Sequence, residues 1–247
     1  MWGIIGKIME QAIFLENKGY CYCCDQEVIF SSESEWLRPN YKCSNCKSIP
    51  RERALMYCIE KFFPDWRTFH IHESSPGWRP SSIKLQRECA NYSPTQFYPE
   101  EPLGKAINGF INQNLEDQTF RDEILDLVIT QDVMEHVFAP DKAFKEIART
   151  LKKGGAHVFT VPLVNKGKPS ERWAELDAEG NTSFFKQPQY HGNPINPKGS
   201  PVAMHWGYDI TDFILKNSGL YTTIYYIDQL DFGIRAEFIE VLISRKH

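Results

Sequence analysis

The sequence predicts an α/β protein built on a doubly wound, mostly parallel sheet that an antiparallel hairpin completes near the C-terminus. Residues 125–161 read as strand, amphipathic helix and strand, the order of a parallel βαβ unit. Two β-rich runs, 221–227 and 237–243, are separated by a turn and suit the closing hairpin. Five cysteines between Cys21 and Cys46 predict in addition a small N-terminal metal-binding subdomain.

Composition narrows the class of protein. A chain of 247 residues has room for one large α/β domain and a small appendage. The net charge of -4 provides no basic field, so nucleic acid is not a favoured partner. The sequence contains no run of about 18 apolar residues, so no membrane-spanning helix is expected. Residues 1–20 lack a secretory cleavage site, so we expect an amphipathic helix or arm there and a cytoplasmic location.

The cysteines form two C-x-x-C pairs, Cys21 with Cys24 and Cys43 with Cys46, with 18 residues between them. Two such turns bring four thiolates to one point, which is typical of zinc ribbons. Cys23 competes with Cys21 or Cys24, and we favour the x-x spacing. Four thiolates leave no open position, so a structural Zn²⁺ is expected, with free or redox-active cysteines as the alternative.

A helix is predicted directly after the second pair, because Pro50 suits a first turn and apolar residues recur at 3–4 spacing up to Phe63. Arg51 and Arg53 either contact substrate or cap the metal-binding segment, and we favour the second role. We therefore divide the chain into residues 1–63 and a larger domain, residues 64–247.

The larger domain resembles a known family. The run D-L-V-I-T-Q-D-V-M-E-H-V at 126–137, then L-K-K-G-G at 151–155 and F-T-V-P at 159–162, are similar to the fourth and fifth motifs of Rossmann-like S-adenosylmethionine-dependent methyltransferases. The run C-S-N-C-K-S-I-P-R-E-R-A-L at 43–55 resembles the zinc-ribbon-like segment that a subset of them carries ahead of the catalytic domain. The resemblance implies a methyl-transfer enzyme that uses S-adenosylmethionine.

The resemblance assigns cofactor contacts to the first strand, which we expect at 66–73. Glu73 takes the place of the acid that ends this strand in the family. In the glycine-rich turn that follows, Ser75 replaces one glycine, and Gly77 is a glycine that is retained. The second strand, expected near 88–93, ends without the family's ribose-binding acid, which Ser93 or Gln96 would replace.

The resemblance also places cofactor contacts later in the chain. Asn114 replaces the aspartate that faces the adenine amino group, and the backbone N–H of Leu115 meets a ring nitrogen; a turn residue is the alternative role for Asn114. Gln131, Asp132 and Val133 leave the carboxyl end of the fourth-motif strand beside the cofactor. We expect Asp141 to cap the next helix, at 142–151, and Gly154 and Gly155 to end it.

A polar, irregular insertion at about 163–207 is expected to act as a substrate loop or lid. Its aromatic residues are candidates for the acceptor pocket, as apolar walls or as ring faces near the sulfonium: Tyr190, Trp206 and Tyr208.

Three histidines are candidate bases. His191 or His205, in the insertion, would remove a proton from an acceptor hydroxyl or amine. His136 is either such a base or a first-turn residue near the cofactor. The alternative for the insertion is turn chemistry, with Asp209 as the cap of a helix at 210–217.

The acceptor expected from these features is a small molecule or a glycan. A nucleic-acid methyltransferase that docks through the zinc ribbon is one alternative, which the acidic balance disfavours. A methyltransferase-like binding protein without turnover is the other, because the first motif is degenerate.

Overall fold

The structure is a computed structural model that describes residues 12–193 and 195–247. Of the N-terminal helix or arm expected at 1–20, residues 1–11 lie outside the described residues, and residues 15–20 belong to a strand and not to a helix. Its central strands are β4 (His70–Ser74), β5 (Asn91–Gln96), β6 (Ala106–Ile107), β7 (Phe110–Asn112), β8 (Leu125–Gln131), β9 (Leu151–Thr160), β16 (Tyr221–Tyr225) and β17 (Val241–Arg245). The helices are α1 (Leu37–Asn40), α2 (Pro50–Phe62), α3 (Pro80–Glu88), α4 (Pro140–Thr150) and α5 (Ile210–Ser218), with short 3₁₀ turns at Trp66–Thr68 (η1) and Leu230–Phe232 (η2).

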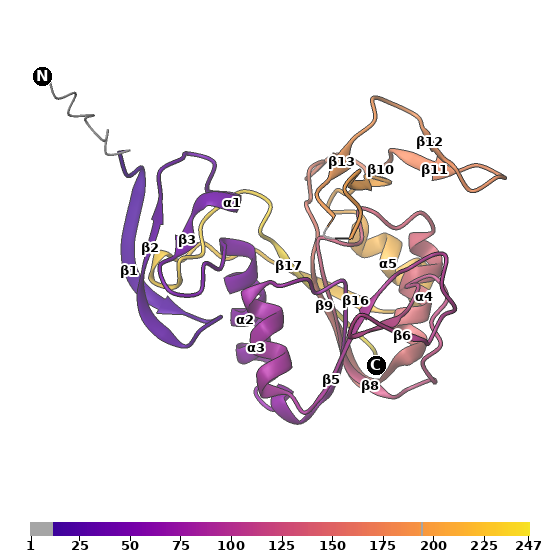
Figure 1. The fold of residues 1–247 in the computed structure, drawn as a ribbon, viewed down its shortest axis with the longest axis horizontal. Coiled ribbons are helices and arrows are strands. Elements are labelled where there is room, and N and C mark those ends of the chain that lie inside the picture. Colours follow the sequence, from indigo (N-terminus) through magenta and orange to yellow (C-terminus); the bar gives the residue numbers. More distant parts are fainter. Residues whose placement is uncertain (1–11, 194) are drawn as a thin grey trace, which may run out of the picture.

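The central strands form one eight-stranded sheet in the order β16-β17-β9-β8-β4-β5-β7-β6 (Figure 1). The inner pairs are parallel, whereas β17 runs antiparallel to both β9 and β16, and β6 antiparallel to β7. The predicted fold class, a mostly parallel sheet with a C-terminal antiparallel hairpin, is confirmed. The strand order reverses beside β4, which places a ligand crevice beyond the carboxyl ends of β4 and β8.

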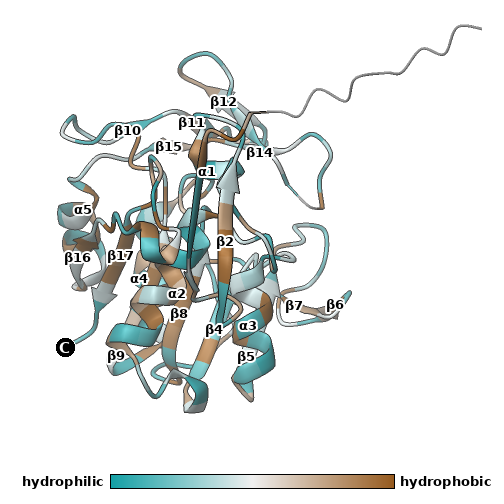
Figure 2. Cartoon of the chain, turned by 90° about the vertical axis from the view of Figure 1, so that its left-hand side faces the viewer, coloured by the Kyte–Doolittle hydropathy of each residue, from teal (hydrophilic) through white to brown (hydrophobic). Residues whose placement is uncertain are grey.

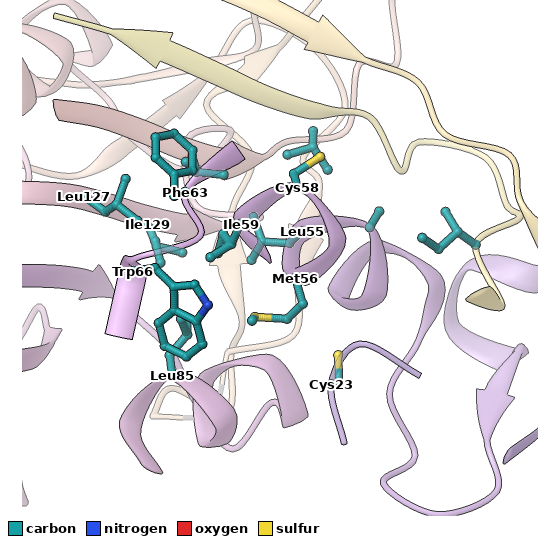
Figure 3. Packing of buried hydrophobic residues seen from close by; sticks show 14 of the residues in the cluster. Cys23, Leu55, Met56, Cys58, Ile59, Phe63, Trp66, Leu85, Leu127 and Ile129 are labelled. Carbon is teal, nitrogen blue, oxygen red and sulfur yellow. The ribbon is translucent and has the colours of Figure 1, made fainter. Parts of the chain in front are cut away.

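Helices cover both faces of the sheet, with α2 and α3 on one side and α4 and α5 on the other (Figure 1). Successive strand residues point to opposite faces. Leu127 and Ile129 of β8 therefore join the cluster around α2, and Val128 joins the one around α4. Figure 3 shows Leu55 and Ile59 of α2 packed beside these β8 residues. Both faces of β8 are buried, which explains its continuous apolar run.

Several predicted boundaries shift. Residues 66–68 form η1, so the first strand starts at His70, and α3 occupies 80–88, so the second strand starts at Asn91. Helix α4 begins at Pro140 after the N-cap Ala139, so Asp141 is not its cap. It ends at Thr150, β9 begins at Leu151, and the two glycines lie within that strand.

Gly155 shows why glycine is needed inside β9. A Cβ there would lie 2.9 Å from the carbonyl oxygen of Lys152 and 3.0 Å from that of Asp126. The pairing of β8 with β9 is irregular between Leu125 and Leu127. Gly155 therefore serves this irregular pairing, and neither glycine ends a helix.

The cysteine-rich segment forms a three-stranded antiparallel sheet, which lies in front of α2 and the central sheet in Figure 2. Its strands are β1 (Leu15–Cys21), β2 (Gln26–Ser32) and β3 (Lys42–Cys43). Arg53 of α2 is fully buried and donates to the carbonyl oxygens of Ser48, Tyr41 and Gly233, so it joins this segment to the C-terminal turn. One hydrophobic cluster runs across residue 63, and the division there stays a prediction.

The insertion forms three two-stranded pairs, β10 with β15, β11 with β12 and β13 with β14. Their bounds are β10 (Glu171–Arg172), β11 (Ala174–Leu176), β12 (Thr182–Phe184), β13 (Tyr190–His191), β14 (Ser200–Pro201) and β15 (Met204–His205). Within the described ranges, no helix combines the length and apolar character that crossing a membrane requires.

Candidate functional site

A cleft of about 450 Å³ opens beyond the carboxyl ends of the parallel strands. Four strand ends and the insertion line it, and the residues that matter below are Ser74, Ser75, Arg79, Gln96, Phe97, Asn114, Leu115, Asp132, Val133, His136, Gly192, Asn193, Ser200 and Pro201. The cleft lies at the edge where open α/β sheets bind ligands, and its volume is typical of small-molecule sites.

Glu73 lies beneath the cleft and does not line it, contrary to its predicted cofactor contact. It is fully buried and accepts hydrogen bonds from Ser82 Oγ and Gln131 Nε2, both 2.7 Å, and from Tyr92 OH at 2.6 Å. Burial raises the pKa of this carboxyl. Gln131, also predicted to contact the cofactor, is fully buried, and its Oε1 accepts from Ser81. The two side chains tie β4, β5, β8 and α3 together, because each polar group needs a partner once buried.

The turn after β4 reaches the cleft through Ser75 and Arg79. Ser75 has a φ of 54°, a left-handed conformation, and its N–H donates to the carbonyl of Thr95. Arg79 Nη1 donates to the carbonyls of Ser75, at 2.8 Å, and Pro76. Gly77 has a φ of 60° and lies outside the cleft lining, so its predicted cofactor contact stays a prediction. Arg79 brings a positive charge that the motif comparison did not single out, since it lies beyond the motif.

Three predicted or considered cofactor residues line the next part of the cleft. Gln96 is the last residue of β5, whereas Ser93 lies in the middle of that strand. The side-chain oxygen of Asn114 accepts from the backbone N–H of Glu116 at 2.9 Å, so Asn114 makes a turn and lines the cleft at once. Leu115 lines the cleft beside it.

Asp132 lines the cleft at the end of β8 with a carboxylate that is already paired. Its Oδ2 lies 2.8 Å from Arg38 Nη2 of α1 and 2.8 Å from Arg51 Nε of α2; the second contact is ionic but not aligned as a hydrogen bond. Thr160 Oγ1 donates to its Oδ1. Burial opposes the charge, but Arg51 and Arg38 outweigh it and hold the pKa of Asp132 below its ordinary value. Arg51 therefore packs against the site. Val133, the residue after Asp132, lines the cleft.

His136 and His191 converge on Glu135 at the insertion side of the cleft. His136 Nε2 and His191 Nδ1 each lie 3.7 Å from Glu135 Oε1, and the two rings meet edge to face with centroids 5.0 Å apart. The Nδ1 of His136 donates to the carbonyl of Pro201 at 2.8 Å. Glu135 raises the pKa of His191, which burial opposes. In the sequence, Glu135 appears only as a member of the run at 126–137, because nothing local shows that β13 returns to it.

Trp206 is part of the core, so its predicted place in an acceptor pocket is wrong. It is fully buried against Phe144 and Phe213, and its Nε1 donates to the carbonyl of Met134. An indole enclosed between two helices cannot reach a ligand.

The remaining predicted residues lie outside the cleft lining. His205 stacks on Trp173 with ring centroids 3.9 Å apart, and burial lowers its pKa. Tyr190 packs near Phe184 and is half exposed, as is Tyr208. Their positions do not support the predicted roles of base and apolar wall.

The four cysteines of the two C-x-x-C pairs come together. Cys21 Sγ lies 3.7 Å from Cys46 Sγ, Cys24 Sγ lies 3.9 Å from Cys43 Sγ, and all four sulfur atoms lie within 4.8 Å of one another. Sulfur atoms at about 2.3 Å from a tetrahedral zinc are about 3.8 Å apart, so the group fits Zn²⁺. Cys23 is outside this group; its side chain is buried beside Met56 in the hydrophobic cluster (Figure 3), and burial raises its pKa.

Comparison with known proteins gives the same architecture. Residues 85–159 match a family model described as a methyltransferase domain. An S-adenosylmethionine dependent methyltransferase from Mesorhizobium loti is 15% identical with a TM-score of 0.50, covering 77% of this chain and 96% of its own. The PH0226 protein from Pyrococcus horikoshii is 13% identical with a TM-score of 0.45, covering 78% and 87%. No curated protein sequence matches the chain. At 15% identity, the likeness to the Mesorhizobium loti protein shows the fold alone.

Proposed function

We propose that the cleft binds S-adenosylmethionine and that the protein methylates a small-molecule or glycan acceptor. The chain carries the domain of class I methyltransferases, which use this cofactor. The observation that carries the proposal is the cleft itself. It gathers the loops after β4, β5, β7 and β8, and the matched segment 85–159 includes three of these four strands.

Each end of the cleft suits one part of the cofactor. Arg79 pairs with the methionine carboxylate beside the Ser75 turn, because it is the cationic side chain in the lining. The Gln96 amide oxygen accepts from a ribose hydroxyl in place of the family's acid. Asn114 and Leu115 adjoin the adenine, where Asn114 keeps a second lone pair on its oxygen.

The acceptor enters from the insertion. Gly192, Asn193 and Ser200 line that side of the cleft with amide and hydroxyl groups, which suit a hydroxyl-bearing molecule. When bound, the cofactor supplies an electrophilic methyl group that passes in line to an acceptor lone pair. The chain's part is to align the acceptor and exclude water, and His136 lines the cleft where a hydroxyl proton would be accepted.

We also propose that the four-cysteine group holds a structural zinc ion. Four thiolates fill a tetrahedral shell, so the ion has no open position for chemistry. Its role is to hold the ribbon, and with it Arg38, against the cleft residue Asp132.

Calorimetric titration with S-adenosylmethionine tests the cofactor site. We expect the Arg79→Gln variant to bind at least about tenfold more weakly, because a charge-assisted hydrogen bond contributes about 1.5–3 kcal/mol. Arg87→Gln is the matched control, since Arg87 lies on the same α3 and is largely exposed. An absence of heat at millimolar cofactor in the native protein would count against the proposal.

A further inference from the structure

Glu135 is a buried carboxylate without a hydrogen-bond donor. Its residue is 2% exposed, and among the described residues no group donates to either Oε1 or Oε2. Its carbonyl oxygen accepts from the N–H groups of Ala203, at 2.7 Å, and Met204, so the insertion holds it in place. A carboxylate deprived of water and donors is costly, so a positive partner must stand beside it.

Two imidazoles face this carboxylate from different segments. His136 follows it in the chain, and His191 is carried back to it by β13. One ring nitrogen of each and one Glu135 oxygen lie within 4.8 Å of one another. The separations of 3.7 Å from Glu135 Oε1 are longer than hydrogen bonds. The three groups surround a common point without bonding directly to each other.

The orientation of His136 is that of a metal ligand. Its Nδ1 lies 2.8 Å from the Pro201 carbonyl, which only accepts, so Nδ1 carries the hydrogen. In the neutral ring, Nε2 then directs a lone pair toward Glu135, and two acceptors facing each other require a cation between them. Metal-binding histidines commonly donate their other ring N–H to a backbone carbonyl in this way.

We propose that Glu135, His136 and His191 hold a divalent transition-metal ion at the edge of the cleft. Two imidazoles and one carboxylate suit Mn²⁺, Fe²⁺ or Zn²⁺ and leave positions open. Ligand atoms about 2.1 Å from a metal are about 3.0–3.4 Å apart, so the two 3.7 Å separations from Glu135 must close by about 0.3–0.7 Å. His191, whose side chain is 48% exposed on a short hairpin, can provide that movement.

The ion would bind an acceptor oxygen through an open position and lower the pKa of its hydroxyl, so that water could take the proton. With its Nε2 on the ion and its Nδ1 hydrogen on the Pro201 carbonyl, His136 would then act as a ligand and not as the base. This role rests on the proposed function, because it presumes an acceptor in the cleft. The ion site does not depend on the proposed function. The meeting of its three ligands, the burial of Glu135 and the tautomer of His136 all hold without a cofactor.

Metal content after equilibrium dialysis against Mn²⁺, Fe²⁺ or Zn²⁺, without cofactor, tests the ion site. We expect the native protein to retain one more ion per chain than Glu135→Gln or His191→Gln with at least one of these metals. His70→Gln is the matched control, since His70 is exposed at the amino end of β4, and it should retain the native content. Circular dichroism confirms that the variants are folded, and His191→Gln alters a half-exposed side chain that the core does not need.

Equal content in the native protein and both cluster variants for all three metals would overturn the proposal. That result would leave a protonated imidazole as the partner of Glu135. Because no cofactor is present, this failure is distinct from a failure to bind S-adenosylmethionine.

Discussion

At the scale of single residues, Asp132 shows how a position can match a family motif and serve a different purpose. It was predicted to meet the cofactor, and it lines the cleft, but its carboxylate is shared by Arg38, Arg51 and Thr160. These partners come from α1, α2 and β9. Two guanidinium groups at one buried point would repel each other without the carboxylate between them.

The Asp132→Asn substitution should therefore lower the free energy of unfolding by about 3 kcal/mol, the cost of leaving buried charges without a partner. Urea titration monitored by circular dichroism measures this loss. Asp122→Asn is the control, because Asp122 pairs with Arg149 while its side chain is 73% exposed, and it should cost less than about 1 kcal/mol. Similar losses in the two variants would show that the Asp132 cluster is not a structural tie.

At the scale of elements, the ribbon and the cleft are linked through short segments. The turn after β2 carries α1, and α1 carries Arg38 to the end of β8. The four cysteines hold the loops that flank these elements, at the ends of β1 and β3. A metal that organises loops contributes directly to their folding.

Cys46→Ser should lower the zinc content by one ion per chain and weaken cofactor binding, because α1 loses its support. Cys23→Ala should keep that zinc, since Cys23 lies outside the four-sulfur group, although a small cavity costs about 1 kcal/mol. Metal analysis and cofactor titration on both variants measure these effects. Zinc loss from Cys23→Ala but not from Cys46→Ser would reverse the ligand assignment.

At the scale of the whole molecule, two histidines make the sheet sensitive to acid. His72 of β4 bonds to Thr95 Oγ1 at 2.9 Å, and His157 of β9 to Thr130 Oγ1 at 3.0 Å. Burial lowers the pKa of both histidines from 6.5 to about 3. Below pH 6.5 the two histidines bind protons in the unfolded chain, whereas in the folded chain they stay neutral until the pH approaches 3. Their contribution to stability is therefore complete above pH 6.5 and is lost progressively as the pH falls toward 3.

Replacing His157 by glutamine should remove half of this dependence. Each histidine contributes a slope of up to about 1.4 kcal/mol per pH unit, so the native protein should lose about 2 kcal/mol more than the variant between about pH 7 and pH 5. Urea unfolding at several pH values measures the slopes. The exposed His70→Gln should behave as the native protein does. Parallel slopes for the native protein and His157→Gln would mean that this ring is protonated in the folded state.

Local patterns explain which elements could be predicted. The β8–α4–β9 unit follows from a continuous apolar run, a stripe containing Ala143, Phe144 and Ile147, and a second apolar run. The boundaries were less certain, since Gly154 and Gly155 suit a helix end as well as an irregular strand pair. The meeting of the four cysteines was predicted because the spacing of the two C-x-x-C pairs by itself brings their sulfur atoms together.

The sequence by itself determined the sheet with its closing hairpin and the four-cysteine group, because each depends on periodicity or spacing over a few residues. Only the tertiary structure decided which polar residues face the cleft. Glu73 and Gln131 lie beneath it, Trp206 lies in the core, and Arg79 lies in its lining. The same holds for the meeting of Glu135 with His191, since contacts between distant segments are set by how the whole chain packs.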